Sequence, residues 1–313
     1  MAEQACERPD SGLGGIWPPI LIETTANGRL NLDAVSVAVS HFAAAGVHGV
    51  YTADSASEFY ALEYDEWNKL ATHFRAQAAA VGLSAGVGCT WTNQAGALRR
   101  VARARELGFD NIHLSPPYWL PLNREAEETF WRAVDKTASD LPIIVYAGSR
   151  GQFNLNGRLL QRIRSFCPAV CGTKSLGFDA VATNSLLTEC ADMAHFVHEQ
   201  VYALWAGLGA VGCFSNLAGL CPAIILDLHR AVCCGAWQRA FELQWRINAF
   251  YQYGAVPVRE AGFMLDKAMA TLGAVPGATR EMRPPYRAVP NELFEGLQRA
   301  ARRYLPECFG GQR

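Results

Sequence analysis

The chain has 313 residues, 50% of them hydrophobic, and a formal net charge of −1. This composition is typical of a soluble globular protein with a large core, and its balanced charges favour neither a nucleic-acid nor a membrane partner. The ten cysteines show neither the paired spacing of a disulfide framework nor that of a zinc site. We therefore interpret them as reduced, core-filling residues of a cytoplasmic protein.

Three segments suggest other protein classes but fit a globular protein better. Residues 1–15 are polar and lack the apolar stretch of a signal peptide, so we expect a flexible lead-in. Residues 99–105, RRVARAR, have arginines at helical spacing, which indicates a solvated helix face. Residues 200–226 carry no charge, but their glycines and proline predict a buried strand with turns and not a membrane span.

Eight short apolar runs rich in β-branched residues predict eight strands. In chain order they are residues 18–24, 46–52, 83–88, 111–116, 141–147, 169–175, 193–198 and 210–215. Segments between them, such as 32–46, 64–82, 94–108 and 125–139, place apolar residues at helical spacing. Alternating strands and helices of this kind predict an α/β protein with a (β/α)8 TIM barrel over residues 16–219.

The last third of the chain predicts helices without further strands. Helical periodicity runs through residues 222–254, 258–273 and 291–305. No Ser/Gly-rich linker precedes this part, and no internal repeat is present. We therefore expect residues 220–313 to form a C-terminal helical module that packs on the barrel or on another subunit, not an independent domain.

The sixth predicted strand ends in Lys174, within VCGTKSLGF at 170–178. Reactive groups of such barrels lie at the C-terminal ends of the strands. Alternation puts Gly172 and Lys174 on one face, and the small Gly172 leaves room for the lysine stem. Burial lowers the pKa of a lysine and yields the neutral amine that attacks a carbonyl to form a Schiff base. A lysine paired with a carboxylate at the barrel rim is the alternative.

A tyrosine, Tyr146, closes the fifth predicted strand 28 residues before Lys174, which leaves room for one helix and a loop. With this order of residues, the chain resembles the dihydrodipicolinate synthase / N-acetylneuraminate lyase family. Its members are class I aldolases and related lyases on a (β/α)8 barrel with a C-terminal helical module. The resemblance implies that Lys174 forms a Schiff base and that Tyr146 moves protons for it.

Further motifs extend the resemblance over residues 15–300. SPPYWLP at 115–121 is similar to the strand-four motif whose tyrosine enters a neighbouring subunit's site. This implies that role for Tyr118 and a homotetramer built as a dimer of dimers. LGAVGCFSN at 208–216, with Phe214, resembles the strand-eight segment that walls the site, and REMRPPYRAVP at 280–290 resembles the family's Arg-Pro-Pro stretch.

The turn after the second predicted strand departs from the family. Its usual sequence is Gly-x-x-Gly-Glu, with central hydroxyl residues whose hydroxyls and backbone N–H groups hold the carboxylate of a keto acid. This chain has DSASE at 54–58. Ser55 keeps the hydroxyl that would join Tyr146 in a proton relay, and Glu58 keeps the acid.

The other three residues of this turn alter the expected carboxylate site. Ala56 lacks the second hydroxyl, and Asp54 and Ser57 replace the glycines. Backbone N–H groups at Ala56 and Ser57 can still bind a carboxylate. The charge of Asp54 would oppose that anion unless the side chain points away. We therefore expect a substrate bulkier than pyruvate, or one that gains much of its binding from an aldol partner.

Two more polar residues near strand ends are candidate substrate contacts. His198 is the last residue of the seventh predicted strand, whereas His195 points to the opposite face of that strand. Because an HExxH motif is also absent, we expect no metal site. Arg150 follows Tyr146 in YAGSR, where it would bind a second carboxylate or lie on the surface.

These residues predict a lyase or aldolase that acts on pyruvate or another 2-keto acid, with an aldehyde as a candidate co-substrate. Lys174 would form the imine, Tyr146 would transfer protons, and Ser55 with Tyr118 would relay them. The protonated imine is the electron sink, so no cofactor is expected. One alternative is a dehydratase of a sugar-derived keto acid that uses the same lysine. The other alternative is a non-catalytic barrel that binds a ligand, and the altered turn at 54–58 supports it.

Overall fold

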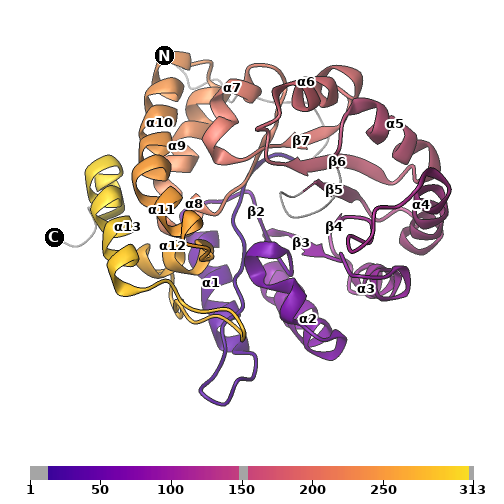
Figure 1. The fold of residues 1–313 in the computed structure, drawn as a ribbon, viewed down its shortest axis with the longest axis horizontal. Coiled ribbons are helices and arrows are strands. Elements are labelled where there is room, and N and C mark those ends of the chain that lie inside the picture. Colours follow the sequence, from indigo (N-terminus) through magenta and orange to yellow (C-terminus); the bar gives the residue numbers. More distant parts are fainter. Residues whose placement is uncertain (1–12, 148–153, 310–313) are drawn as a thin grey trace.

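The computed structural model describes residues 13–147 and 154–309, which form a barrel of eight parallel strands with helices around it (Figure 1). The strands are β1 Gly15–Trp17, β2 Gly49–Thr52, β3 Ser84–Gly88, β4 Asn111–Leu114, β5 Ile143–Ala147, β6 Val170–Ser175, β7 Ala194–Phe196 and β8 Gly212–Phe214. Ladder pairing runs in the order β1-β8-β7-β6-β5-β4-β3-β2. Hydrogen bonds from His48 N–H to Ile16 O (3.1 Å) and from Tyr51 N–H to Pro18 O (3.2 Å) join β2 to β1. The predicted (β/α)8 barrel is confirmed.

The first strand lies earlier in the chain than predicted. It covers Gly15–Trp17, and the run at 18–24 that was expected to be this strand follows it as loop. Pro18 and Pro19 have no N–H to donate, so regular pairing stops after Trp17 and only a single parallel bridge, between Pro19 and Tyr51, follows. The apolar side chains of Ile20 and Ile22 are fully buried in the main hydrophobic cluster instead. The other seven predicted strands overlap β2 to β8.

Six helices follow strands β1 to β6 and surround the barrel from its lower side (α1) past the right-hand side to the top (α6) in Figure 1. They are α1 Leu32–Ala45, α2 Tyr64–Ala80, α3 Gln94–Glu106, α4 Arg124–Ala138, α5 Gly157–Phe166 and α6 Ala180–Glu189. Five of them begin at an Asn or Asp whose side chain accepts a hydrogen bond from a backbone N–H of the first turn: Asn31, Asn93, Asn123, Asn156 and Asp179. Such caps satisfy a donor that the helix itself leaves unpaired. The short α7 (Tyr202–Ala206) lies between β7 and β8.

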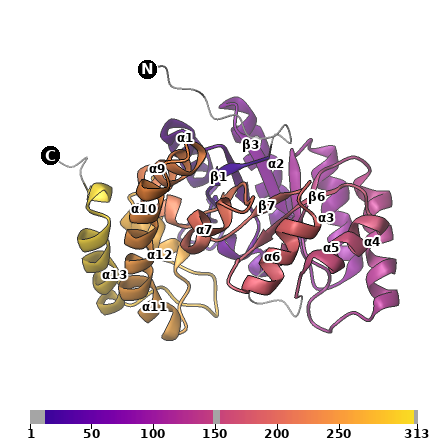
Figure 2. The same ribbon diagram turned by 90° about the horizontal axis from the view of Figure 1, so that it is seen from above.

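The C-terminal helices gather on one side of the barrel, with α13 outermost (Figures 1 and 2). They are α8 Leu217–Leu220, α9 Pro222–Cys233, α10 Trp237–Phe250, α11 Val256–Glu260, α12 Asp266–Leu272 and α13 Asn291–Tyr304. Their buried side chains form one hydrophobic cluster with Ile16 of β1 and Cys213 of β8, so they share a core with the barrel. Within the described residues, no helix is long and apolar enough to cross a membrane.

Buried charges tie this helical part to the turn after β2. The Lys267 ammonium of α12 lies 3.0 Å from Glu58 Oε1 and 3.9 Å from Glu23 Oε2. The backbone N–H of Arg283 donates to Glu58 Oε2 at 2.9 Å. The side chains of Lys267 and Glu58 are 3% and 0% exposed, so water does not screen the pair. The network therefore holds the 280–290 segment against the turn.

We expect Lys267→Met to lower the free energy of unfolding by about 3–5 kcal/mol, because it leaves buried carboxylates without their counter-charge. Urea unfolding followed by circular dichroism measures the change. The control is Arg132→Ala, which removes an exposed pair between Arg132 Nε and Glu128 Oε1 (2.8 Å) and should cost less than about 1 kcal/mol. Equal, small effects of the two substitutions would contradict the prediction.

Candidate active site

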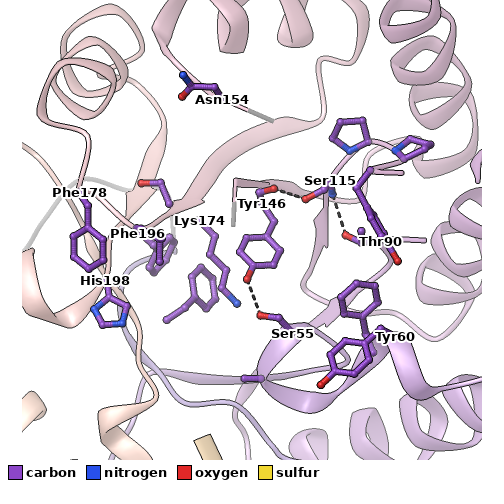
Figure 3. A pocket seen from close by; sticks show the side chains of 18 of the residues that line it. Ser55, Tyr60, Thr90, Ser115, Tyr146, Asn154, Lys174, Phe178, Phe196 and His198 are labelled. Atoms are coloured by element: carbon purple, nitrogen blue, oxygen red, sulfur yellow. Dashed lines mark hydrogen bonds between the residues drawn. The ribbon is translucent and has the colours of Figure 1, made fainter. Parts of the chain in front are cut away.

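The C-terminal ends of the strands surround a cavity of about 910 Å³. Lys174, Tyr146 and Ser55 lie together at its base, as Figure 3 shows. Much of the remaining wall is aromatic and comes from Tyr51, Phe59, Tyr60, Tyr118, Phe178, Phe196, Phe214, Phe263 and Tyr286. Polar and charged side chains also line it, among them Arg124, Glu127, Arg162, Arg259 and Asp266. A cavity that combines an aromatic wall with convergent polar groups is typical of a small-molecule site.

Lys174 is buried among aromatic rings near the end of β6, and only 9% of its surface is exposed. Its Nζ lies 3.9 Å from the ring centre of Tyr51, 4.6 Å from that of Tyr146 and 5.0 Å from that of Phe214. Burial lowers the pKa of Lys174, although the nearby carboxylate of Asp54 opposes this shift. Burial therefore makes the Lys174 ammonium easier to deprotonate than that of an exposed lysine.

The glycine near Lys174, Gly172, is required because β7 packs closely against β6 at this position. A Cβ on Gly172 would overlap the carbonyl oxygen of Ala194 on β7. The expectation that Gly172 makes room for the lysine stem therefore has to be corrected. Its missing side chain lets β6 and β7 approach each other.

Tyr146 lies beside Lys174 because the two residues are partners in the β5–β6 register. Its phenol group and the Ser55 hydroxyl are 2.8 Å apart and share a hydrogen bond (Figure 3). The hydroxyl of Ser115, after β4, donates to the carbonyl oxygen of Tyr146 and so fixes the end of β5. The structure thus brings together the lysine, the tyrosine and the serine that the sequence singled out.

Asp54 points inward, toward Lys174. Its Oδ2 accepts hydrogen bonds from Lys174 Nζ at 2.6 Å and from His113 Nδ1 at 2.6 Å, and the residue is 1% exposed. Burial would raise the pKa of Asp54, but Lys174 and His113 outweigh it and lower the pKa to about 2. Asp54 is therefore a carboxylate paired with Lys174. The positive charge of Lys174 compensates that of Asp54 at the place where a substrate carboxylate would approach.

His113 of β4 is a site residue that the sequence analysis did not single out. It is fully buried, and burial lowers its pKa despite the neighbouring Asp54. Because a carboxylate can only accept, Nδ1 of the neutral ring carries the proton. The signal in the sequence was a histidine inside a strand buried on both faces, where a polar side chain needs a partner.

Four further predicted residues line the cavity: Ala56, Tyr118, His198 and Phe214. Nδ1 of His198 accepts a hydrogen bond from the Gln200 N–H at 3.2 Å, and burial lowers the pKa of this histidine. A neutral His198 therefore presents Nε2–H as a donor. Tyr118 contacts Phe59 edge to face, with 6.2 Å between ring centres, in the cavity wall of its own chain.

Two of the remaining three predicted substrate contacts, Ser57 and Glu58, point away from the cavity. Ser57 is buried and donates its hydroxyl to the carbonyl oxygen of Ile20 at 2.8 Å. Glu58 is buried in the ion pair with Lys267. The N–H groups of Ser57 and Glu58 are bonded within the turn, to Asp54 O and Ser55 O. We correct the expectation that both side chains face the substrate, because the turn directs them away from it. Arg150 lies outside the described residues.

Comparison with known proteins places this site in a family. A model of the Dihydrodipicolinate synthetase family matches residues 12–303. The chain belongs to this family. It is a lyase of the class I aldolase type, as the strand-six lysine and strand-five tyrosine predicted.

The similar proteins are distant in sequence. A 4-hydroxy-tetrahydrodipicolinate synthase of Methanospirillum hungatei is 26% identical over 82% of this chain and 91% of its own. An uncharacterized DapA-like lyase of Rhizobium meliloti is 24% identical over 92% of this chain and 95% of its own. Among solved structures, the sialic acid aldolase of Ruminococcus gnavus has a TM-score of 0.83 at 19% identity, covering 96% of this chain and 99% of its own. A putative dihydrodipicolinate synthetase from Pseudomonas aeruginosa also has a TM-score of 0.83, at 22% identity, covering 93% and 99%. At such identities the solved structures show the fold alone.

Proposed function

We propose that this enzyme cleaves or forms a C–C bond of a 2-keto acid through an imine on Lys174. The observation that carries the proposal is the position of Lys174 on β6, in register with Tyr146, whose phenol is hydrogen-bonded to Ser55 at the cavity base. A buried amine beside a hydroxyl pair is what carbonyl attack and proton transfer require. Family membership agrees with this chemistry.

Imine formation needs a proton on the departing oxygen. The neutral amine of Lys174 attacks the keto carbon, and the carbonyl oxygen takes a proton from the Tyr146 phenol. The nitrogen releases one of its two protons as it bonds to the carbon. With this second proton the oxygen leaves as water, and the nitrogen is left in a protonated imine. Ser55 shares its hydrogen bond with Tyr146 and relays to the phenolate the proton that the Lys174 ammonium gave up when it became the amine.

Bond cleavage uses the imine as electron sink. The electrons of the C3–C4 bond move toward the positive nitrogen and form an enamine, while the C4 hydroxyl loses its proton to solvent by way of the Tyr146–Ser55 pair and becomes an aldehyde. The enamine then takes a proton at C3 through the same pair, and hydrolysis of the resulting imine returns Lys174 and the shorter keto acid. The reverse sequence adds an aldehyde to the enamine.

The shape of the cavity supports a substrate bulkier than pyruvate. Its volume of about 910 Å³ is at the upper end of the range for small-molecule sites. At Ala56, which lines it, the methyl group gives a carboxylate no hydroxyl contact. Aromatic walls such as Phe59 and Phe178 lie where the distal part of a longer keto acid or an aldehyde would be bound.

Reductive trapping tests the proposal. The protein is incubated with a panel of 2-keto acids and borohydride, and the adduct is mapped by intact mass and peptide analysis. The chain has only four lysines, so the map is simple. We expect the mass of the reduced ligand on Lys174, with larger keto acids trapped at lower concentration than pyruvate. No adduct on Lys174 with any keto acid would refute the proposed function.

We also propose that the enzyme is a homotetramer in which Tyr118 contributes to a neighbour's site. The loop that carries Tyr118 exposes Trp119 and Leu120 to 78% and 72%, which is unusual for a free surface. Sedimentation of the wild type should give a tetramer, and the double substitution Trp119→Ser, Leu120→Ser should give smaller species. Val181→Ser, at a residue of α6 that is 82% exposed, is the control. A fully active wild-type monomer would contradict this prediction.

A further inference from the structure

We propose that Asp54 is a catalytic residue of this chain, which removes the proton from the Lys174 ammonium and then acts as counter-ion of the protonated imine, with His113 holding it in place. The inference rests on the proposed Schiff-base function and extends it. It assigns a role to the residue by which the turn departs most from the family pattern.

Contact with the reacting nitrogen is the first argument. Asp54 Oδ2 lies 2.6 Å from Lys174 Nζ. Within the described residues, no other carboxylate lies at ion-pair distance from this nitrogen, and Asp266 and Glu199 act on it from farther away. The other neighbours of Nζ are the rings of Tyr51 from β2, Tyr146 from β5 and Phe214 from β8. Asp54 is therefore the nearest base to the ammonium.

The barrel is shaped to hold this carboxylate. A Cβ on Gly88 of β3 would overlap both Ala53 O and Asp54 Oδ1. A Cβ on Gly86 would lie 2.6 Å from Asn111 Oδ1 and 3.0 Å from His113 Nε2. Two glycines on one strand thus leave the space that Asp54 and His113 fill.

Backbone strain is consistent with a functional role. Ala53, just before Asp54, has a φ of 58°, a left-handed conformation that costs free energy for any residue with a Cβ. Such strain is concentrated at functional sites. Moreover, a buried ion pair contributes little net stability, because desolvation of both charges offsets their attraction. A stabilising role alone therefore explains the Asp54–Lys174 pair poorly.

The proton inventory balances. The ammonium of Lys174 gives one proton to Asp54 and becomes the amine that attacks the carbonyl carbon. A second proton leaves the nitrogen when the carbinolamine forms. These two protons balance the two that the carbonyl oxygen carries away as water, so the proton that Tyr146 donates to this oxygen is replaced. The nitrogen then bears one proton and a positive charge in the imine. Asp54, again a carboxylate, faces that charge.

His113 is a positioning residue in this scheme. It donates Nδ1–H to the same oxygen that faces Lys174. Burial lowers its pKa, so the ring stays neutral and adds no charge that would compete with the imine. Removal of the ring should loosen Asp54 without removing its charge.

The test compares the wild type with Asp54→Asn, in which the side chain keeps its shape and loses its charge. Trapping with cyanoborohydride and a 2-keto acid is measured across pH, together with turnover. The charge of Asp54 raises the pKa of Lys174 above the value that burial alone would give. In Asp54→Asn the midpoint of trapping should therefore move to lower pH. Turnover at the optimum should fall by about 10²-fold, the lower end of the range for acid–base groups, because Tyr146 remains.

Two results would contradict the two proposals separately. A wild type that gives no Lys174 adduct overturns the proposed function. A wild type that does give the adduct, with an Asp54→Asn variant of unchanged rate and pH midpoint, overturns the role of Asp54 alone.

If circular dichroism shows that Asp54→Asn does not fold, His113→Gln takes its place. A lower rate with a smaller shift of the midpoint then supports the proposal, and wild-type behaviour overturns it. Asp33→Asn, on the first turn of α1, is the control and should match the wild type.

Discussion

Replacing Lys174 with alanine is expected to abolish both turnover and adduct formation. Lys174 lines the cavity, and the other three lysines cannot take over its role. Lys69 and Lys136 lie exposed on α2 and α4, and Lys267 is bound to Glu58. Without a primary amine at the cavity base there is no imine and therefore no electron sink. The measurements are the initial rate with the best keto acid from the trapping panel and the intact mass after borohydride treatment.

A matched variant separates lost chemistry from lost structure. Lys136→Ala removes an exposed lysine and should keep the wild-type rate and adduct. Lys174→Met fills the volume of the side chain but leaves Asp54 without its cation, so the pKa of Asp54 should rise from about 2 toward its ordinary value. An adduct that persists in Lys174→Ala would show that another group is the nucleophile.

Tyr146→Phe is expected to lower kcat by about 10²- to 10⁴-fold, the usual range for a general acid–base group, while the fold is kept. The substitution removes the hydroxyl that is hydrogen-bonded to Ser55 and leaves the ring near Lys174 Nζ. Because the lost interaction belongs to the transition state, kcat and kcat/KM should fall together. Steady-state kinetics at several pH values measures both.

The control for this prediction is a phenol elsewhere in the molecule. Tyr253 lies in the helical part and is 65% exposed, so Tyr253→Phe should leave the rate unchanged. Trapping of the imine by Tyr146→Phe should be slower but should still label Lys174. A near-normal rate in a folded Tyr146→Phe variant would assign proton transfer to another group, with Asp54 as the first candidate.

Much of the fold could be predicted because it depends on local patterns. Apolar runs and helical periodicity located β2 to β8 and the helices, and Asn or Asp residues mark five helix starts. The first strand was misplaced because the apolar run at 18–24 is longer than β1, which has only three residues, Gly15–Trp17. That run is buried in the core, and burial alone does not distinguish a strand from a loop.

By itself, the sequence determined the barrel, the strand ends that carry Lys174 and Tyr146, and hence the class of lyase. Only the tertiary structure decided how the β2 turn is used. Asp54, His113 and Lys174 come from segments some 60 residues apart, and only closure of the barrel brings them to a shared oxygen at 2.6 Å. The same closure turns Ser57 and Glu58 away from the cavity, because Ile20 O and Lys267 are their partners. The direction of a side chain in a turn depends on partners far away in the chain, which no local pattern reveals.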